Sequence, residues 1–295
     1  MEPISIVDAC LDGSTVDILI SKGRIERISP AGVVKPSGEI LNASGGLVSP
    51  PYADPHLHLD AVLLGHSCPN QSGTLKEGIR NWAVARENLT EEDLLRRANL
   101  AVRWCVANGT GRIRTHVDCA SMLAIEVLCQ FRSDIAHLVD LQVVAFPQEG
   151  VFREPNQAAA LTRAVKAGVD CVGAIPHHEG SREDGDRSIE LAFDLAEAHG
   201  IRVDLHCDET DNPQSRHILK VCEEVRKRDF KSHVLAGHCT ALHSYPQHVA
   251  EKTIDSIAES GVQVVANPLD NIVLQGRLDS YPKRRGITRI PELLE

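Results

Sequence analysis

The sequence predicts an α/β protein whose main part is a TIM-type (β/α)8 barrel, with a small N-terminal β-sandwich portion before it. Three observations predict this fold. Short β-branched runs recur at regular intervals from Leu47 onward, and capped helical stretches separate them. Nearly every run also ends in polar side chains that are capable of chemistry. Strands that alternate with helices in this way are typical of a parallel sheet.

The first part of the chain differs from the rest and predicts a small all-β unit. Apolar and polar residues alternate in VDILI and RIERI, and Lys22-Gly23 lies between these two runs. Alternation on both sides of a turn dipeptide is typical of a β-hairpin. We therefore expect a β-sandwich portion in residues 1–48 and the barrel in residues 49–295.

The helical stretches between the strand-like runs have recognisable ends. In residues 90–108, Thr90 can cap the first turn with Asp93 reaching back to it, and Asn108-Gly109 ends the helix. A second helix is expected at about residues 188–200. The first helix presents one apolar face at helical spacing, made of Leu94, Leu95, Ala98, Val102 and Cys105.

Two parallel-sheet architectures fit this alternation, a closed barrel and an open doubly wound sheet. The strands of a barrel all end at one rim, whereas an open sheet needs polar residues only at its switch point. No GxGxxG or GxxxxGK[ST] motif follows any run. Polar residues that end the runs favour the barrel: His56, His58, His116, Gln148, His177, His206, Glu209, His238 and Asn267.

Composition and charge exclude several classes of protein. A formal net charge of −10 opposes binding to nucleic-acid phosphates, although it does not oppose binding of a neutral nucleobase. No apolar run is long enough to cross a bilayer, and the N-terminus lacks the basic start of a secretory signal. The 9 cysteines occur singly, which is typical of reduced thiols in the cytosol. We expect a cytoplasmic protein. The sequence leaves open whether it forms a homo-oligomer.

The strongest signal of chemistry is the motif Asp54-Pro55-His56-Leu57-His58. Residues two apart on a strand point to the same side, so His56 and His58 project together into the barrel. An isolated HxH is also compatible with a structural role. His206 and His238 end two later runs and favour the functional interpretation, because packing alone hardly explains histidines at several strand ends. No lysine ends the run CVGAIPHHE, so we expect a single metal ion.

Long collinear motifs resemble those of bacterial cytosine deaminases in the amidohydrolase superfamily. The similarity runs from about Ser49 to the last residue, and the N-terminal strands fit the family's β-sandwich. It is carried by HLHLD, NQSGTLKEGI, RTHVD, LQVVAFPQEG, GAIPHHE, DLHCDE, GHCTALHSY and NPLDNIVLQGRLDSYPKRRGITR. The resemblance implies that His56, His58 and His206 bind one divalent metal ion, Zn or Fe(II).

The same resemblance implies roles for four further residues. Glu209 corresponds to a proton shuttle, and His238 to the residue that holds the attacking water. Gln148 matches the residue that reads the base, and the loop around Leu75 matches the one that closes over it. The chemistry agrees, because a metal held by neutral imidazoles lowers the pKa of its water and a glutamine amide complements the carbonyl and N–H of cytosine.

His116, His177 and Glu179 are assigned no definite role. His116 and His177 could orient metal ligands, or they could be ordinary hydrogen-bonded histidines at the rim. Glu179 has a counterpart in the family motif without an assigned function. The family also supplies an aspartate ligand at the end of strand eight, and the sequence ends at Glu295 before that strand. We therefore expect a barrel without its last strand, as part of a longer protein, in which Asp270 is not a substitute ligand.

The leading functional hypothesis is hydrolytic deamination of a small heterocyclic base, from cytosine to uracil and ammonia. Within the same family, isocytosine, creatinine-like rings and amino-triazines are alternative substrates. A hypothesis from another class is a catalytically silent ligand-binding remnant of the fold. The expected partner is a small-molecule base, with neither nucleic acid nor a membrane.

Overall fold

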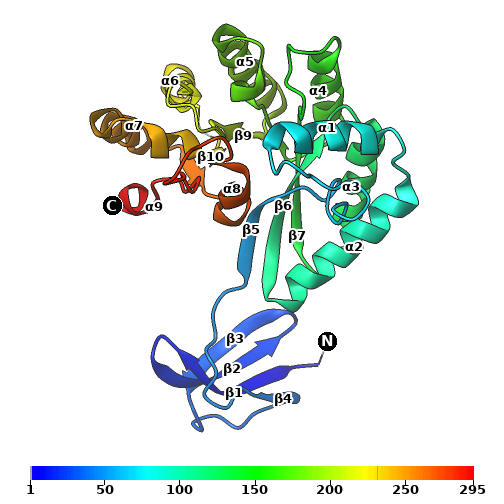
Figure 1. Cartoon of the computed structure of the whole chain (residues 1–295). Helices are drawn as coiled ribbons and strands as arrows, with labels where there is room; N and C mark the ends of the chain where they lie inside the picture. The colour runs from blue at the N-terminus through cyan, green and yellow to red at the C-terminus, as the bar shows by residue number, and fades with distance from the viewer. Residues whose placement is uncertain (1, 231) are drawn as a thin grey trace. The chain divides into compact units, whose positions relative to one another are not determined.

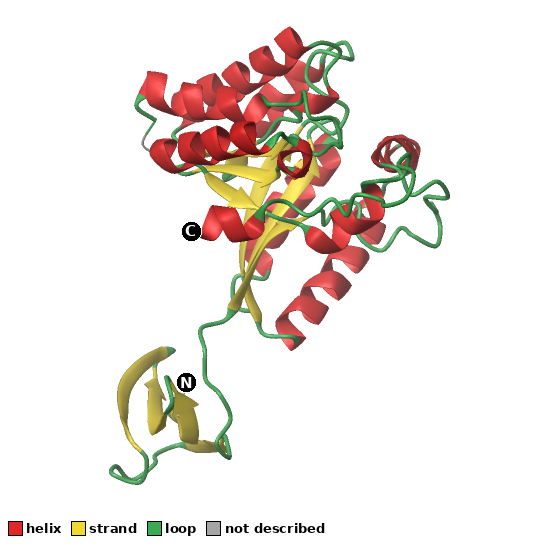
Figure 2. Ribbon diagram, turned by 60° about the vertical axis from the view of Figure 1, so that its left-hand side comes forward, coloured by secondary structure: helices red, strands yellow, loops and turns green. Residues whose placement is uncertain are grey.

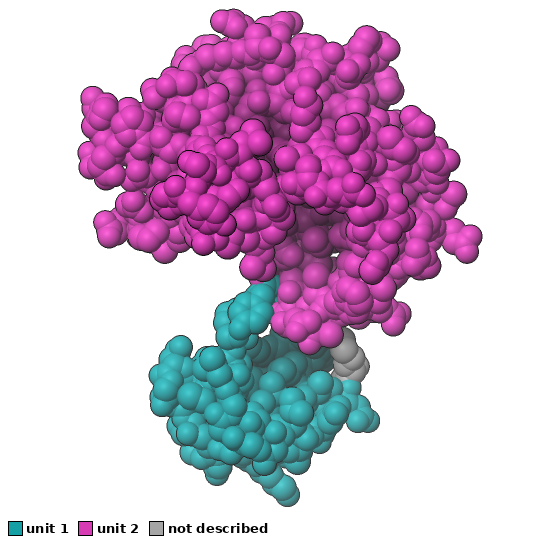
Figure 3. All heavy atoms as spheres, viewed as in Figure 1, with its two compact units in different colours: residues 1–52 teal, residues 53–295 magenta. Residues whose placement is uncertain are grey.

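The computed structural model of this chain describes residues 2–230 and 232–295, and it divides into two compact units. The first covers residues 1–52 and the second residues 53–295 (Figure 3). In the described part of the chain, no helix combines the length and apolarity needed to cross a membrane.

The small unit is a four-stranded sheet, and its described residues form strands and loops without a helix (Figure 2). Its strands are β1 (Ile4–Leu11), β2 (Ser14–Ser21), β3 (Arg24–Pro30) and β4 (Glu39–Asn42), in the order β3-β2-β1-β4. The expected hairpin is present, since β2 and β3 pair antiparallel around Lys22-Gly23. Both turn residues have positive φ, 51° and 74°, as a two-residue turn of type I′ requires.

The second unit is a nearly closed barrel of parallel strands, which confirms the predicted fold class. The described part of its sheet has seven strands that follow the chain in the order β11-β10-β9-β8-β7-β6-β5. Every pair with a described register is parallel. The strands are β5 (Tyr52–Leu57), β6 (Thr110–Asp118), β7 (Asp140–Phe146), β8 (Cys171–Val172), β9 (Arg202–Cys207), β10 (Val234–His238) and β11 (Gln263–Val265).

Helices follow the strands, and α2 to α7 lie in chain order around the outside of the sheet (Figure 1). The helices are α1 (Leu75–Arg86), α2 (Glu91–Ala107), α3 (Met122–Asp134), α4 (Gln157–Lys166), α5 (Arg182–His199), α6 (His217–Arg228), α7 (Gln247–Ser260), α8 (Pro268–Leu274) and α9 (Ile290–Leu294). Two 3₁₀ turns, η1 (Pro176–His178) and η2 (Thr240–Ser244), follow β8 and β10.

Two expectations about helix ends need correction. Thr90 caps α2 as predicted, by accepting from the backbone N–H of Asp93, but the Asp93 carboxylate does not reach back. It binds Arg96 and Arg97 instead, because two guanidinium groups on the next turn offer charge-assisted hydrogen bonds. Helix α5 begins at Arg182, earlier than predicted, since Ser181 provides the cap.

Alternation along the strands separates an apolar layer from a polar barrel interior. On β9, Val203 and Leu205 belong to the main apolar core, which the helices cover. Asp204 and His206 lie between and beyond them, so they point to the other side of the sheet. Both polar residues are nonetheless buried. The fold therefore places ionisable groups in the interior, where each needs a partner.

Arg97 on α2, outside the sheet, is also a buried ionisable group, and it gives a test of the fold. Its side chain is 2% exposed and donates to the backbone oxygens of Asp60 and Val62, just after β5, at 2.8 Å each. Arg97→Met leaves both carbonyls without this donor, so we expect the free energy of unfolding to fall by about 1–3 kcal/mol. Urea denaturation measures this loss.

Arg96 is the matched control, because it also binds Asp93 but is 66% exposed. Arg96→Met should lower the free energy of unfolding by less than about 1 kcal/mol. Equal losses in the two variants would contradict an anchoring role for Arg97.

Candidate metal and catalytic site

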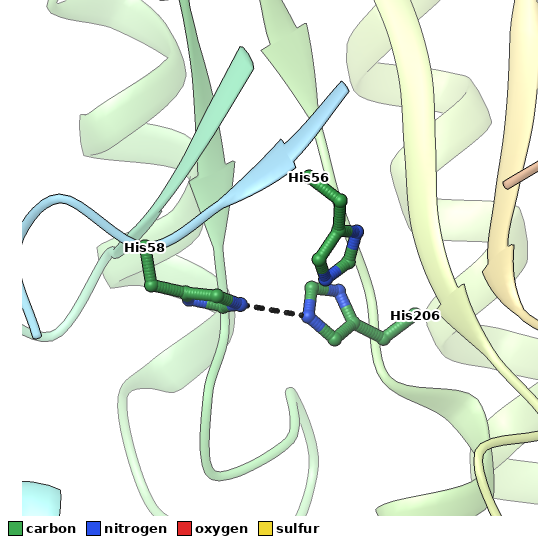
Figure 4. Close-up of side chains that lie close together, drawn as sticks. All are labelled: His56, His58 and His206. Atoms are coloured by element: carbon green, nitrogen blue, oxygen red, sulfur yellow. Dashed lines mark hydrogen bonds between the residues drawn. The ribbon is translucent and has the colours of Figure 1, made fainter. Parts of the chain in front are cut away.

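Three histidines from two strands of the barrel converge on one point of its interior. His56 lies on β5 and His58 directly follows it, while His206 lies on β9. One ring nitrogen from each of these three residues lies within 4.8 Å of the other two (Figure 4). The Nε2 atoms of His58 and His206 are 3.1 Å apart. The three predicted metal ligands are therefore neighbours in space.

These three imidazoles suit a divalent cation. Burial lowers the pKa of His56, His58 and His206 well below the usual value, and the neighbouring imidazoles lower it further. Neutral imidazoles keep a lone pair for a metal ion. Among the described residues, the buried Nδ1 atoms of His56 and His206 have no hydrogen-bond partner. The donor set fits Zn and Fe(II) alike.

Close packing around the cluster restricts which residues can stand there. Gly237 pairs in register with His206 on the neighbouring strand. A Cβ at Gly237 would come within 3.2 Å of the His56 ring, so a side chain there would push against it. Phe146, at the end of β7, stacks on the His206 ring at 4.0 Å between centroids. The absence of a Cβ at Gly237 thus leaves room for the His56 ring, and the flat ring of Phe146 packs on that of His206.

His116 lies against the cluster on another side. Its ring is 4.4 Å from that of His56 and 4.6 Å from that of His206. His116 Nε2 lies 3.0 Å from Asp204 Oδ1, and Arg114 donates to Asp204 Oδ2 at 2.7 Å. A carboxylate only accepts, so His116 Nε2 carries the proton. His116 therefore has a hydrogen-bonded partner and also contacts two of the candidate ligands.

His238, at the end of β10, links the cluster to a buried carboxyl group. Its Nε2 lies 3.1 Å from His56 Nε2, and its Nδ1 lies 3.2 Å from Glu209 Oε1. Burial raises the pKa of Glu209 to about 7 and lowers that of His238 to about 4. A carboxyl group with a pKa near 7 can both accept and donate a proton at neutral pH.

Two residues that follow β11, Asp270 and Asn271, lie beside His238. Asn271 contacts both His238 Nδ1 and Glu209 Oε1, at 3.0 Å and 2.9 Å. Asp270 Oδ2 lies 3.8 Å from His238 Nδ1. Partial burial, and to a smaller extent the nearby charge of Glu209, raises the pKa of Asp270 to about 7. Sequence reasoning missed Asn271, because nothing in NPLDN distinguishes one amide from another.

The remaining candidates lie on loops and turns at the same ends of the strands. Gln148 is half-buried in the turn after β7. Leu75 begins α1 and packs against an apolar cluster of Ile79, Phe146 and Ile175. Because Phe146 also stacks on His206, the start of α1 is connected to the histidines by direct packing.

His177 and Glu179 have different environments. Both ring nitrogens of His177, in η1, are buried without a hydrogen-bond partner among the described residues. Burial and then the charge of His238 lower the His177 pKa. Glu179 accepts from the backbone N–H groups of Val151 and Phe152, so it shapes the loop after β7.

A cavity of about 600 Å³ is lined by residues other than the clustered histidines. It is formed by α1, the loop before it, the loop after β7 and His178. Glu149, which follows Gln148 directly, contributes to its wall. The cavity therefore borders the turn that carries the predicted base-reading residue.

Comparison with known proteins gives consistent matches over most of the chain. The profile of the amidohydrolase family matches residues 83–295. A curated pterin deaminase from Rhizobium rhizogenes is 30% identical over 282 residues, which cover 94% of this chain and 64% of the relative. N-isopropylammelide isopropyl amidohydrolase from Pseudomonas is 26% identical, with 85% and 64% coverage. The chain thus spans 64% of the length of these curated relatives.

Solved structures agree with this family. The 5-methylcytosine deaminase from Klebsiella pneumoniae, liganded with 5-fluorocytosine, superposes with a TM-score of 0.93 at 40% identity. That match covers 98% of this chain and 71% of the deaminase. N-isopropylammelide isopropylaminohydrolase from Burkholderia multivorans has a TM-score of 0.75 at 26% identity, with 90% and 68% coverage.

The histidine cluster predicts how metal binding depends on single residues. His56→Ala and His206→Ala each remove one donor, so we expect at least about tenfold weaker zinc binding in each variant. Equilibrium dialysis with metal analysis measures the affinity, and circular dichroism checks the fold. The exposed His137 provides the control, and His137→Ala should bind zinc as the unchanged protein does. Unchanged affinity in both cluster variants would contradict the metal site.

Proposed function

Because the chain belongs to the amidohydrolase family, we propose that it deaminates a small heterocyclic base, with cytosine or a 5-substituted cytosine as substrate. The observation that carries this proposal is the contact between two groups of residues. Three neutral imidazoles that can hold a metal ion lie next to His238, and His238 contacts a buried carboxyl group whose pKa is about 7. Hydrolysis of a cyclic amidine needs an activated water and a proton carrier in this arrangement.

The three histidines His56, His58 and His206 would hold the cation. When bound, Zn or Fe(II) would supply Lewis-acid activation of water for attack on the ring carbon that bears the amino group. In this proposal His238 Nε2 accepts a hydrogen bond from the attacking water. Its lowered pKa keeps this imidazole neutral, so Nε2 retains a lone pair for that purpose.

Glu209 would move the protons. Its carboxylate accepts a proton from the attacking water and passes it to the ring nitrogen next to the reacting carbon. The remaining proton, that of the added hydroxyl group, would then pass through Glu209 to the amino group, so that the C–N bond breaks and cytosine and water become uracil and ammonia. A pKa near 7 suits both directions of transfer, because neither protonation state is strongly favoured at neutral pH.

Gln148 and Leu75 would select and enclose the base. The amide of Gln148 offers one donor and one acceptor, which complement the adjacent N–H and carbonyl of cytosine. Leu75 would cover the bound ring and exclude bulk water. The similarity to a 5-methylcytosine deaminase at 40% identity favours a pyrimidine, while 30% identity to a pterin deaminase makes a pterin the second candidate.

A panel of bases tests the proposal. We would measure ammonia release by the zinc-loaded and Fe(II)-loaded protein with cytosine, 5-methylcytosine, isocytosine, a pterin, an amino-triazine and creatinine. One of the two cytosines should have the highest kcat/KM, by roughly 10²-fold or more over a base that leaves the Gln148 amide unpaired. A faster pterin would move the substrate to that class. Metal binding without ammonia release from any base would instead favour a silent remnant of the fold.

Glu209→Gln separates catalysis from binding. The variant keeps the size of the side chain and can still form hydrogen bonds, but it cannot carry the proton. We expect turnover to fall by roughly 10²–10⁴-fold while zinc stays bound. Steady-state kinetics and metal analysis on the same sample measure both quantities. Activity within about threefold of the unchanged protein, or joint loss of zinc and activity, would remove Glu209 from the shuttle role.

Gln148→Ala tests base recognition, and here KM rather than turnover is the quantity that should change. Loss of the paired amide should raise KM for the base by roughly 10–100-fold and leave zinc content unchanged. The exposed Gln130 on α3 is the matched control, and Gln130→Ala should leave KM unchanged. An unchanged KM in Gln148→Ala would show that another residue reads the base.

A further inference from the structure

Asn271 is a fully buried amide between His238, which holds the attacking water in the proposed mechanism, and Glu209, which moves the protons. Its Oδ1 lies 3.0 Å from His238 Nδ1, and its Nδ2 donates to Glu209 Oε1 at 2.9 Å. We propose that Asn271 is a positioning residue that fixes the tautomer of His238 and the orientation of the Glu209 carboxylate. This inference rests on the proposed deaminase function, because both groups matter there through the proton that each holds.

The chemistry of the amide determines which nitrogen of His238 carries the proton. Oδ1 of Asn271 can only accept, so His238 Nδ1 must donate to it. The lone pair of His238 then lies on Nε2, the nitrogen that is 3.1 Å from His56 Nε2. With the amide turned over, Oδ1 would face the Glu209 carboxylate and, whenever that group is ionised, would lose its donor. One side chain therefore controls two neighbours at once.

Asn271 is itself rigidly held. Its backbone N–H donates to Asn267 at 3.0 Å, and its backbone oxygen accepts from Gln275 at 2.9 Å, so both ends belong to the α8 turn. Gly286 packs so closely on this oxygen that a Cβ would come to 2.5 Å. Gly286 has φ +64°, which a glycine adopts without strain. These contacts fix the backbone from which the amide projects, and the hydrogen bonds to His238 and Glu209 hold the amide itself.

His238 needs such support because its backbone is unusual. Its φ is +66°, in the left-handed region that residues with a side chain rarely adopt. Such a conformation persists where surrounding contacts hold it. Thr288 Oγ1 donates to the His238 carbonyl oxygen, and Asn271 holds the ring. The backbone and the ring of His238 are thus fixed by separate partners.

Apart from Glu209, whose Oε1 lies 3.2 Å from His238 Nδ1 and whose orientation Asn271 sets, the polar neighbours of His238 cannot replace Asn271. Asn267 Nδ2 lies 3.3 Å from His238 Nδ1, but an NH2 group cannot accept a proton from an N–H. Asp270 is 51% exposed and lies 3.8 Å from the same nitrogen. Among these residues, Asn271 alone is buried, accepts from the imidazole and donates to the carboxylate.

Two variants separate the two contacts. Asn271→Leu removes both hydrogen bonds, whereas Asn271→Asp keeps an acceptor for His238 but removes the donor to Glu209. We expect kcat to fall by roughly 10²-fold in both variants, with KM and bound zinc within about threefold of the unchanged protein. Asn99→Asp, at an exposed position of α2, makes the same chemical change away from the site and should leave kcat unchanged. Unchanged kcat in Asn271→Leu, or a rise in KM alone, would overturn the proposal.

The tautomer of His238 can be read without turnover. In protein labelled with ¹⁵N-histidine, the ring resonances of His238, assigned with His238→Gln, should report a protonated Nδ1 and an unprotonated Nε2. Asn271→Asp should keep this pattern, and Asn271→Leu should lose it. The same pattern in Asn271→Leu would overturn the proposal. This measurement decides the role of Asn271 even if no base is deaminated, so it stays distinct from failure of the proposed function.

Discussion

Asp204 and His206 point into the barrel because side chains alternate along β9, while Val203 and Leu205 pack in the apolar layer under the helices. The rest of the site depends on this alternation. Parallel strands in regular order repeat it around the sheet, so each strand contributes inward-facing residues to the same enclosed space. The barrel interior consequently holds imidazoles and carboxylates, and His116, Asp204, His206, Glu209 and His238 among them are buried.

Burial then determines the chemistry of these groups. Loss of hydration disfavours the charged form, so it lowers the pKa of the imidazoles and raises that of Glu209. The same physical cause thus produces neutral imidazoles at the candidate metal site and raises the pKa of Glu209 to about 7. The Asp204 carboxylate has different partners from that of Glu209, because Arg114 and His116 both bind it.

Helix α1 contacts both the end of β6 and the apolar cluster that contains Phe146. Trp82 donates to Asp118 Oδ2 at 2.8 Å, and Arg86 forms an ion pair with the same carboxylate at the end of β6. At its other end α1 packs, through Leu75, against the cluster that contains Phe146. Phe146 stacks on His206, so the helix that borders the cavity packs against a residue that contacts a candidate metal ligand. Packing through Phe146 thus links the position of α1 to that of His206.

The alternation of strands and helices and the histidines at the strand ends could be predicted from the sequence. Both follow from local periodicity, which each segment carries within its own few residues. The partners of these side chains, in contrast, depend on how the chain folds. His116 meets Asp204 across 88 residues of chain, and His238 meets Asn271 across 33. Such contacts depend on strand order, register and the curvature of the sheet. No local pattern encodes these, so an asparagine such as Asn271 has no signal until the barrel has formed.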